Sequence, residues 1–193
     1  MALEFILEQF PLEKKLRDGT SVVLRPLARS DAAKLHKFFT AVPEVERLAI
    51  AERVTDRAVV DRWCRTLDPE KQFTLLLLAG SKVIGEATLR QNPGGWKRHI
   101  GNLTLLTHPD YRGRDAIKVM AEEIIEIARH LGMSRLESEL NGERTTALKA
   151  LESLGFKQLL HVPDYVTDMQ TITHDYHLMG MELLTDEEFT AAG

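Results

Sequence analysis

Apolar residues spaced three and four positions apart predict a long amphipathic helix over about 115–131. One face of this helix must be buried, because its apolar side chains form a continuous stripe at helical period. Gly132 follows the last apolar position and is expected to end the helix as its C-cap. The stripe consists of Ile117, Met120, Ala121, Ile124, Ile127, Ala128 and Leu131.

Short apolar runs between turn residues predict the strands. The turn at Asp18-Gly19 precedes a strand over about 22–27, and Gly80-Ser81 joins two strands within 73–91 as a hairpin. The strand at 99–108 leads directly into the long helix. The remaining predicted strands cover 134–140, 157–165 and 174–184.

Three further helical regions complete the pattern. One begins near Ser30 or Asp31, either of which can cap it, one follows Pro43 and ends near 67, and one covers 142–156. The order β-α-α-β-β-β-α-β-α-β-β has a strand–helix–strand unit at its centre, which favours parallel pairing there and antiparallel hairpins on either side. We therefore expect a mixed α/β fold in one domain over 1–193, with 1–17 as an N-terminal extension and 185–193 as a C-terminal tail.

Composition narrows the classes of function. The formal net charge is −4 with a pI near 6.0, and no sustained basic run is present, which argues against a dedicated nucleic-acid binder. The leucine run at 75–79 is too short to cross a bilayer, and the N-terminus lacks the basic start of a signal peptide. The single cysteine, Cys64, excludes an internal disulfide and is expected to be a packed, inert thiol. We expect a cytoplasmic protein with no membrane or nucleic-acid partner.

The turn between the 99–108 strand and the long helix raises a question of chemistry. It reads Tyr111-Arg112-Gly113-Arg114 and is followed by Asp115, where free helix amides can bind a phosphate. As an N-cap, the Asp115 carboxylate would accept from these same amides. A carboxylate about 5 Å from a phosphate charge costs roughly 3 kcal/mol at an effective dielectric of about 20. From these residues alone, a capped turn that binds no phosphate is the commoner alternative.

Three features together resemble the GNAT acyl-CoA N-acyltransferases over about 16–184. They are the element order, the "HPDYRGR" turn that enters a long helix, and "ALKALESLGF" followed by two strands. The opening segment, "LRDGTSVVLRPLARSDAAKLHKFF", looks most like GNAT domains related to bacterial protein-lysine acetyltransferases. The resemblance implies a central mixed sheet of about six to seven strands, with helices on both faces and a splayed pair of strands at a coenzyme cleft.

The resemblance also implies a site for acetyl-CoA, or another acyl-CoA, as co-substrate. Backbone groups at Leu105, Leu106 and Thr107 would pair with the pantetheine. The pyrophosphate would be held by the amides around the turn, namely those of Arg112, Gly113, Arg114, Asp115, Ala116 and Ile117. The chain departs from the family pattern at several positions: Asp115 and Ile117 replace small residues, Asn102 a glutamate, and Leu151 a tyrosine.

Few residues remain as candidates for a general base. Glu86 lies on the strand after the Gly80-Ser81 turn, and Glu139 shares one face of its strand with Glu137. For each, a solvated or ion-paired carboxylate is the structural alternative. His108 is more typical of a capping residue, and His174 and His177 flank Tyr176 on an exposed strand face. No His/Cys/Asp/Glu cluster has metal-ligand spacing, so no metal is expected.

Two functions follow from these observations. The first is an acyl-CoA-dependent N-acyltransferase that acetylates a small-molecule amine or a protein lysine. The second is a catalytically degenerate GNAT domain that senses a ligand or binds a partner protein, which the departures at Asp115, Ile117, Asn102 and Leu151 favour. The acyl acceptor carries no recognisable code in the first two helices, and the N-terminal extension could pack on a second subunit in a homodimer.

Overall fold

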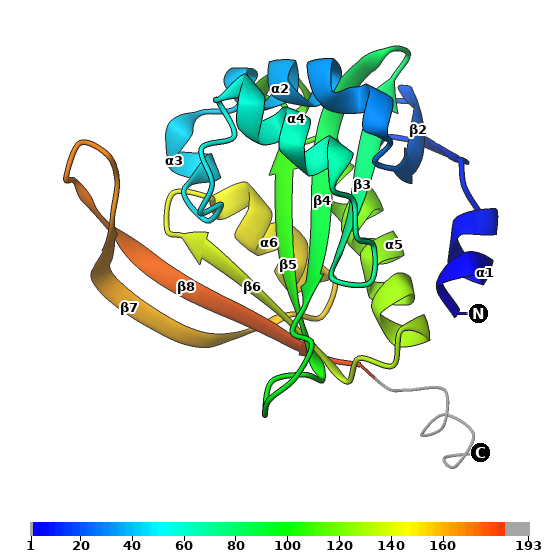
Figure 1. The fold of residues 1–193 in the computed structure, drawn as a ribbon. Helices are drawn as coiled ribbons and strands as arrows, with labels where there is room; N and C mark the ends of the chain where they lie inside the picture. Colours follow the sequence, from blue (N-terminus) through cyan, green and yellow to red (C-terminus); the bar gives the residue numbers. More distant parts are fainter. Residues whose placement is uncertain (1, 184–193) are drawn as a thin grey trace.

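The computed structural model describes residues 2–183 and contains one eight-stranded mixed sheet with helices on both faces (Figure 1). The predicted fold class is confirmed, with more strands than the six to seven expected. In spatial order the strands run β1-β2-β3-β4-β5-β6-β8-β7. They are β1 (Leu12–Lys15), β2 (Ser21–Pro26), β3 (Gln72–Ala79), β4 (Lys82–Gln91), β5 (Ile100–Thr107), β6 (Arg135–Asn141), β7 (Lys157–Thr167) and β8 (Thr173–Glu182). The helices are α1 (Ala2–Glu8), α2 (Ala32–Ala41), α3 (Glu44–Arg47), α4 (Arg57–Arg65), α5 (Ala116–His130) and α6 (Thr145–Ser153), with 3-10 turns η1 (Arg29–Asp31) and η2 (Pro109–Tyr111).

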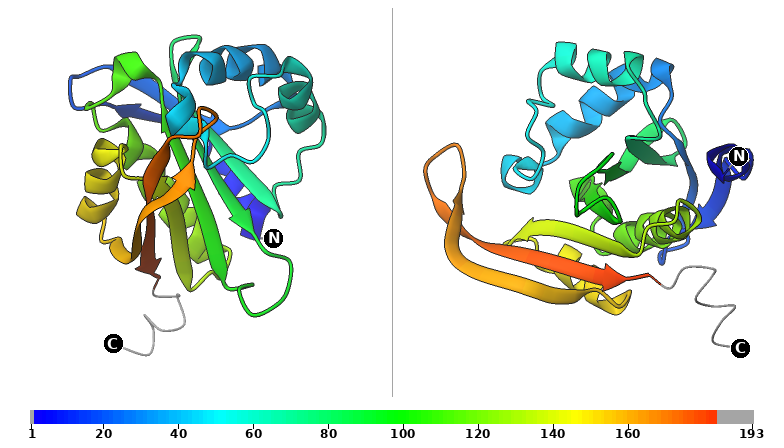
Figure 2. Two further views of the ribbon diagram at one scale, coloured as in Figure 1. Left: turned by 90° about the vertical axis from the view of Figure 1, so that its left-hand side faces the viewer. Right: turned by 60° about the horizontal axis from the view of Figure 1, so that its bottom comes forward.

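The parallel pair predicted at the centre of the sheet is formed by β5 and β6, and it is short. Ile100 to Asn102 pair with Arg135 to Glu137, after which no further β5–β6 pairing occurs although both strands continue. Every other neighbouring pair in the sheet is antiparallel. The two strands therefore splay apart toward their carboxyl ends, and the long β7–β8 hairpin projects from one side of the molecule (Figures 1 and 2).

Two hydrophobic cores hold the helices against the sheet. The central β3 run is buried on both faces, because Leu75 and Leu77 belong to the core beneath α5 and α6 while Leu76 and Leu78 belong to the core beneath α2 and α4. The α5 stripe is confirmed as core, with Met120, Ala121 and Ile124 fully buried. Leu151 on α6 is buried in the same core, which accounts for leucine at this position.

The N-terminal extension contains more structure than the sequence predicted. Ile6 of α1 is buried in the core that contains α5, and β1 pairs with β2 as the edge of the sheet. The sequence of α1 shows no clear amphipathic pattern, because the helix has only seven residues and its apolar side chains Phe5 and Leu7 are exposed. The division of the chain into domain, extension and tail stays a prediction, and position 184 and the 185–193 tail lie outside the described residues.

The helical regions between residues 30 and 67 also differ from the expectation in detail. The predicted helix after Pro43 is two helices, α3 and α4, and Asp56 caps the second by accepting from the Ala58 amide at 2.9 Å. Asp31 precedes α2 but makes no side-chain cap to it. Its carboxylate instead accepts two hydrogen bonds from Arg25, at 2.6 and 2.7 Å, and one from the Ala28 amide. These contacts lower the pKa of Asp31 although burial opposes them.

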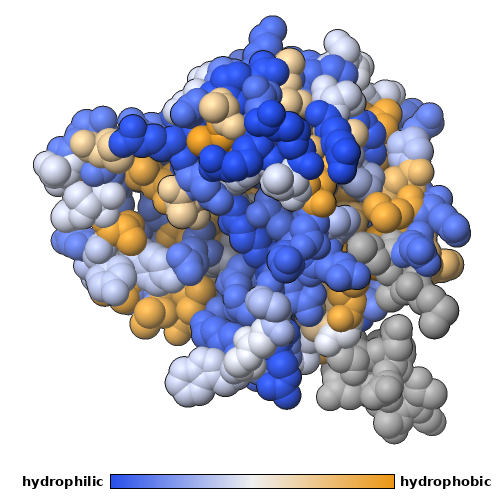
Figure 3. Space-filling view, viewed as in Figure 1, coloured by the Kyte–Doolittle hydropathy of each residue, from blue (hydrophilic) through white to orange (hydrophobic). Residues whose placement is uncertain are grey.

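Hydrophilic residues cover most of the face shown in Figure 3, and apolar residues gather at its left, over the β7–β8 hairpin. The exposed apolar side chains of this hairpin include Leu159, Leu160, Met169 and Ile172. No helix within residues 2–183 has the length and apolarity required to span a membrane.

Candidate functional site

The largest cavity opens where β5 and β6 splay apart. We call it the α5–α6 cavity, because the first turn of α5 and one side of α6 line it together with Thr107 at the end of β5. Its volume is about 400 Å³. Its position at the splayed strands agrees with the cleft expected from the sequence.

The turn that enters α5 forms one wall of this cavity. Gly113 and Asp115 both have left-handed backbone conformations, with φ of 69° and 66°. Aspartate is among the few residues besides glycine that adopt this conformation readily. The expectation that the Asp115 carboxylate occupies the helix amides is wrong, since its side chain makes no capping hydrogen bond. A residue whose side chain caps the first turn of a helix normally has an extended backbone, whereas the backbone of Asp115 is left-handed.

Contacts from the β1–β2 hairpin hold this turn in place. The Arg17 amide donates to the Arg114 carbonyl at 3.2 Å, and Arg17 Nη2 donates to the Gly113 carbonyl at 2.6 Å. Arg17 Nε also lies 4.0 Å from Asp115 Oδ2 and offsets part of its charge. Arg114 pairs with Asp18 at 2.8 Å and stacks over Tyr111, so its charge is used to support the turn and it does not line the cavity.

Of the sequence-predicted phosphate-binding residues, the structure places Arg112, Gly113, Asp115, Ala116 and Ile117 on the wall of the α5–α6 cavity. Five basic and three acidic side chains line the cavity as a whole, which favours an anion. Ile117 packs partly against the α5 core, so its branched side chain is accommodated beside the cavity. The basic lining residues are Arg17, Arg112, Lys118, Arg144 and Lys149, and the acidic ones are Glu46, Asp115 and Glu143.

Arg144 is a site residue that sequence reasoning missed. Its side chain is buried between the splayed strands, where Nη2 donates to the Leu105 carbonyl. Burial lowers the pKa of Arg144 to about 10, although the nearby Glu46 favours the charged form. The backbone of Leu105, expected to pair with a pantetheine, therefore already has a side-chain partner. No sequence signal marked Arg144, because an arginine in a polar run before a helix is ordinarily exposed.

A second cavity, of about 270 Å³, meets the first at Arg144 and Glu46, which line both. We call it the α3–β8 cavity, because α3 forms one side and Tyr176 of β8 the other. The Asn141 side chain donates to the Val45 carbonyl at 2.5 Å and ties α3 to the end of β6. Glu46 also pairs with Arg112, so the boundary between the two cavities consists of charged side chains.

Glu139, one of the two predicted bases, lines the α3–β8 cavity. The other acidic residue on this wall is Glu46, and the only basic lining residue is Arg144. Burial, together with the Glu139 carboxylate, raises the pKa of the Tyr176 hydroxyl to about 12, so Tyr176 stays protonated at neutral pH. Glu137, two residues before Glu139, is paired with Lys97 at 3.1 Å.

Glu86, the other predicted base, lies in a different environment. It is almost completely buried on β4 and accepts from the Thr88 hydroxyl, while its Oε2 has no hydrogen-bond partner in the part of the chain that the structure describes. Burial raises the pKa of Glu86 to about 7. It lines neither of the two larger cavities nor a third, of about 130 Å³, that Arg90, Asn102 and Glu139 line beside β6. Glu86 and Glu139 therefore do not line the same cavity.

His108 and Cys64 have the structural roles expected from the sequence, those of a capping residue and a buried thiol. His108 caps η2 by accepting from the Asp110 amide at 3.2 Å. Cys64 is fully buried, and burial raises the pKa of its thiol to about 11. The sequence spacing indicated no metal-ligand cluster, but the pairing of β7 with β8 brings His161, Asp175 and His177 together as a group that could hold a metal ion. Sequence spacing hid this group, since His161 is on a different strand from the other two.

Comparison with known proteins gives a consistent family. The acetyltransferase (GNAT) domain profile matches residues 21–157. The GNAT domain of S. lividans PAT superimposes with a TM-score of 0.72 at 18% identity, covering 90% of this chain and 97% of that one. The structure of yncA from Salmonella typhimurium with its cofactor acetyl-CoA has a TM-score of 0.71 at 16% identity, with coverage of 84% and 94%. Ribosomal-protein-alanine N-acetyltransferase from Brucella melitensis has a TM-score of 0.70 at 17% identity, with coverage of 83% and 99%.

Proposed function

The chain belongs to the GNAT acetyltransferase family, and from this premise we propose that it is an acyl-CoA-dependent N-acyltransferase that acetylates an amine. The observation that carries this proposal is the opposite charge of two adjoining cavities. The α5–α6 cavity has more basic than acidic lining residues, whereas the α3–β8 cavity has more acidic than basic ones. A diphosphate is an anion and an amine is a cation in water, so each cavity suits one of the two substrates.

On the coenzyme side, we assign the pyrophosphate of acetyl-CoA to the turn at the start of α5. None of the amides from Arg112 to Ile117 donates to the Asp115 carboxylate, and the Arg112 amide donates to the Pro109 carbonyl at 3.3 Å, so the pyrophosphate is assigned to the amides from Gly113 to Ile117. Lys118 adds positive charge, and Arg112 adds charge that its pairing with Glu46 partly offsets. The relative yncA has been solved with acetyl-CoA, which supports this class of co-substrate. The pantetheine is assigned to the backbone of Leu105, Leu106 and Thr107, and Arg144 must release the Leu105 carbonyl before that carbonyl can pair with it.

On the acceptor side, we assign the role of general base to Glu139. A lysine-type amine with a pKa near 10.4 must lose a proton before it attacks, and a carboxylate in the acceptor cavity can take that proton directly or through water. The new N–C bond forms as the C–S bond breaks, the nitrogen then releases its second proton to water, and the thiolate that leaves takes up a proton from water. Arg144, at the boundary of the two cavities, supplies positive charge beside the thioester oxygen as negative charge develops there.

The acceptor is an amine that is cationic in solution, either a small molecule or a protein lysine. Structurally similar enzymes include a spermidine N-acetyltransferase chimera and ribosomal-protein-alanine acetyltransferases, so the fold accommodates acceptors of both sizes. A cytoplasmic location, a homodimer and the absence of nucleic-acid or membrane partners stay predictions from the sequence.

A second function, that of a non-catalytic GNAT module, is favoured by two observations. Arg144 already binds the Leu105 carbonyl inside the cleft, and Asp115 places a negative charge at its mouth. A domain of this kind would bind a ligand or partner at the same cavities without transferring an acyl group.

The test combines acetyl-CoA binding with thiol release. Calorimetric titration measures binding, and a chromogenic thiol reagent measures free coenzyme A when spermidine or a lysine-containing peptide is added. Cys64 gives little background because it is buried. We expect saturable binding and amine-dependent thiol release. Saturable binding with no release for either amine class would favour the non-catalytic module, and no binding would overturn the proposal.

A further inference from the structure

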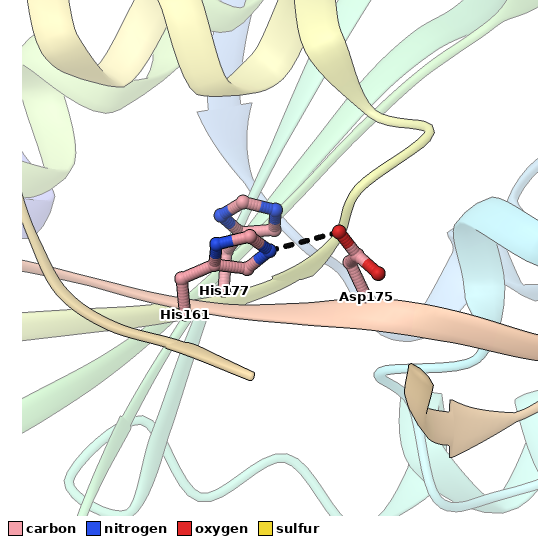
Figure 4. Close-up of side chains that lie close together, drawn as sticks. All are labelled: His161, Asp175 and His177. Carbon is pink, nitrogen blue, oxygen red and sulfur yellow. Dashed lines mark hydrogen bonds and ion pairs between the residues drawn. The ribbon is translucent and has the colours of Figure 1, made fainter. Parts of the chain in front are cut away.

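A cluster of two imidazoles and a carboxylate lies on the β7–β8 hairpin, outside the cavities described above. His161 and His177 are direct cross-strand partners, and Asp175 lies two residues before His177 on the same face of β8. One ligand atom from each residue lies within 4.8 Å of the other two. Figure 4 shows the three side chains on the same side of the hairpin, with the two imidazole rings stacked.

Neighbouring groups orient two of these side chains. His177 Nδ1 lies 2.9 Å from Gln158 Oε1, an acceptor, so Nδ1 carries the proton and the Nε2 lone pair is free. The Asp164 amide donates to Asp175 Oδ1 at 3.2 Å, and Asp175 Oδ2 lies 2.8 Å from His161 Nε2. The His161–Asp175 contact alone would account for two of the three residues. The Gln158 contact orients His177, whose Nε2 has no hydrogen-bond partner within residues 2–183 and so remains available as a ligand atom.

We propose that His161, Asp175 and His177 form a binding site for a borderline first-row divalent cation, with Zn²⁺ as the main occupant. Two imidazole nitrogens and one carboxylate oxygen are a donor set that suits zinc and does not suit Mg²⁺ or Ca²⁺. Zinc bonds of about 2.0–2.2 Å place tetrahedral ligand atoms about 3.3 Å apart. The three ligand atoms now lie within 4.8 Å of one another, and side-chain rotations that unstack the two imidazole rings would bring them to that separation. A water would complete the coordination.

The position of the cluster gives the ion a structural role. By strand alternation, Asp175 and His177 lie on the face of β8 opposite Tyr176 and the α3–β8 cavity. The Gly142 amide donates to the Asp175 carbonyl at 2.9 Å, and a Cβ at Gly142 would lie 3.5 Å from His177 Nε2. A bound ion would therefore cross-link β7 and β8 next to the turn that carries Arg144, and it would take no part in acyl transfer.

The test is a titration of the full chain, freed of any affinity tag and treated with chelator, with Zn²⁺ and separately with Co²⁺. Calorimetry with Zn²⁺ should give one site per chain, and Co²⁺ should give the visible absorption bands of a low-symmetry N/O site. Thermal unfolding should shift to higher temperature with Zn²⁺, because only the folded hairpin assembles the ligands. Absence of stoichiometric zinc uptake by the folded wild type would overturn the proposal.

Variants assign the uptake to these residues. His177→Gln and Asp175→Asn should each weaken zinc binding by about tenfold or more, and Gln158→Leu should weaken it less, because Gln158 orients His177 without ligating. His174→Ala is the matched control. It lies on the same strand, but its two ring nitrogens face different carboxylates, those of Glu143 and Asp168, at 2.9 and 3.0 Å. Zinc uptake that survives in a folded His177→Gln variant, or that is lost in His174→Ala alone, would refute the assignment.

Discussion

The α5–α6 cavity and the α3–β8 cavity meet at the same two side chains but have opposite charge. Both are lined by Arg144 and Glu46, yet basic residues prevail on the first and acidic residues on the second. The first is built around the turn and first residues of α5 and one side of α6, and the second from the side chains of β6, β8 and α3. Under the proposed function, this difference in charge would direct the two substrates to different cavities that meet at Arg144.

The largest expected effect concerns the acidic cavity. Glu139→Gln should lower kcat/KM for the amine by at least about a hundredfold, because a positioned general base contributes roughly that much or more. Calorimetric affinity for acetyl-CoA should change less than about twofold, since Glu139 does not line the α5–α6 cavity. Glu137→Gln is the matched control, two residues away and paired with Lys97. Equal losses in both variants would remove Glu139 from the base role.

The next effect concerns Glu86, the buried carboxylate of β4, whose ionised form the charge of Arg144 favours. The folded pKa of Glu86 is about 7 against 4.5 for an ordinary glutamate. Between pH 4.5 and about pH 7, the Glu86 carboxyl has lost its proton in the unfolded chain but keeps it in the folded chain. The free energy of unfolding therefore falls as pH rises through this range and is not changed further by Glu86 above about pH 7. The full loss of stability from this one carboxyl is about 3 kcal/mol.

Glu86→Gln should therefore gain stability relative to the wild type between pH 5 and pH 8, as measured by urea unfolding at both values. Glu122→Gln, an exposed substitution on α5, is the control and should follow the wild-type profile. If the difference between Glu86→Gln and wild type is the same at both pH values, the carboxyl of Glu86 does not titrate in this window.

A smaller effect is expected at the mouth of the basic cavity. Asp115→Gly and Asp115→Asn should each raise the affinity for acetyl-CoA by about tenfold, because both remove a negative charge and both residues tolerate the left-handed backbone. Arg17 already offsets part of this charge, which keeps the gain below the full Coulomb cost. Calorimetry measures the change. Improvement in the glycine variant alone would identify side-chain bulk, in place of charge, as the obstacle.

The smallest effect should be at Tyr176. Because burial and the Glu139 carboxylate raise its pKa to about 12, the hydroxyl remains protonated throughout the working range and does not act as a general base. Tyr176→Phe should change kcat for the amine by less than about threefold and leave the shape of the pH–rate profile between pH 7 and 10 unaltered. A profile that loses its alkaline limb in this variant would show that Tyr176 titrates during turnover.

Strong periodicity made most of the scaffold predictable. The apolar stripe fixed α5 to within a residue or so of its observed bounds, Ala116–His130, because a buried helix face allows little freedom in register. The turn at Gly80-Ser81 likewise located the β3–β4 hairpin. Periodicity did not predict the short helices. Helix α1 has seven residues, two of them exposed apolar ones, and helix α3 has four residues.

The candidate site was less predictable, because its important contacts join distant parts of the chain. Arg144 reaches the Leu105 carbonyl across 39 positions, and Glu46 reaches Arg112 across 66. Asp115 shows a second limit, since its identity suggested a capping carboxylate and only the backbone angle revealed that the side chain faces Arg17. Residue types identified the loop, while their tertiary partners determined what each side chain does.

Arg17 lies outside the 21–157 segment that matches the family profile, yet it holds two carbonyls of the loop assigned to the diphosphate. The β1–β2 hairpin thus supports this turn, and a change at Arg17 would alter that support while leaving every residue of the turn unchanged. Relatives that differ only in their first twenty or so positions would then differ in coenzyme affinity, and chimeras exchanging that segment would transfer the trait.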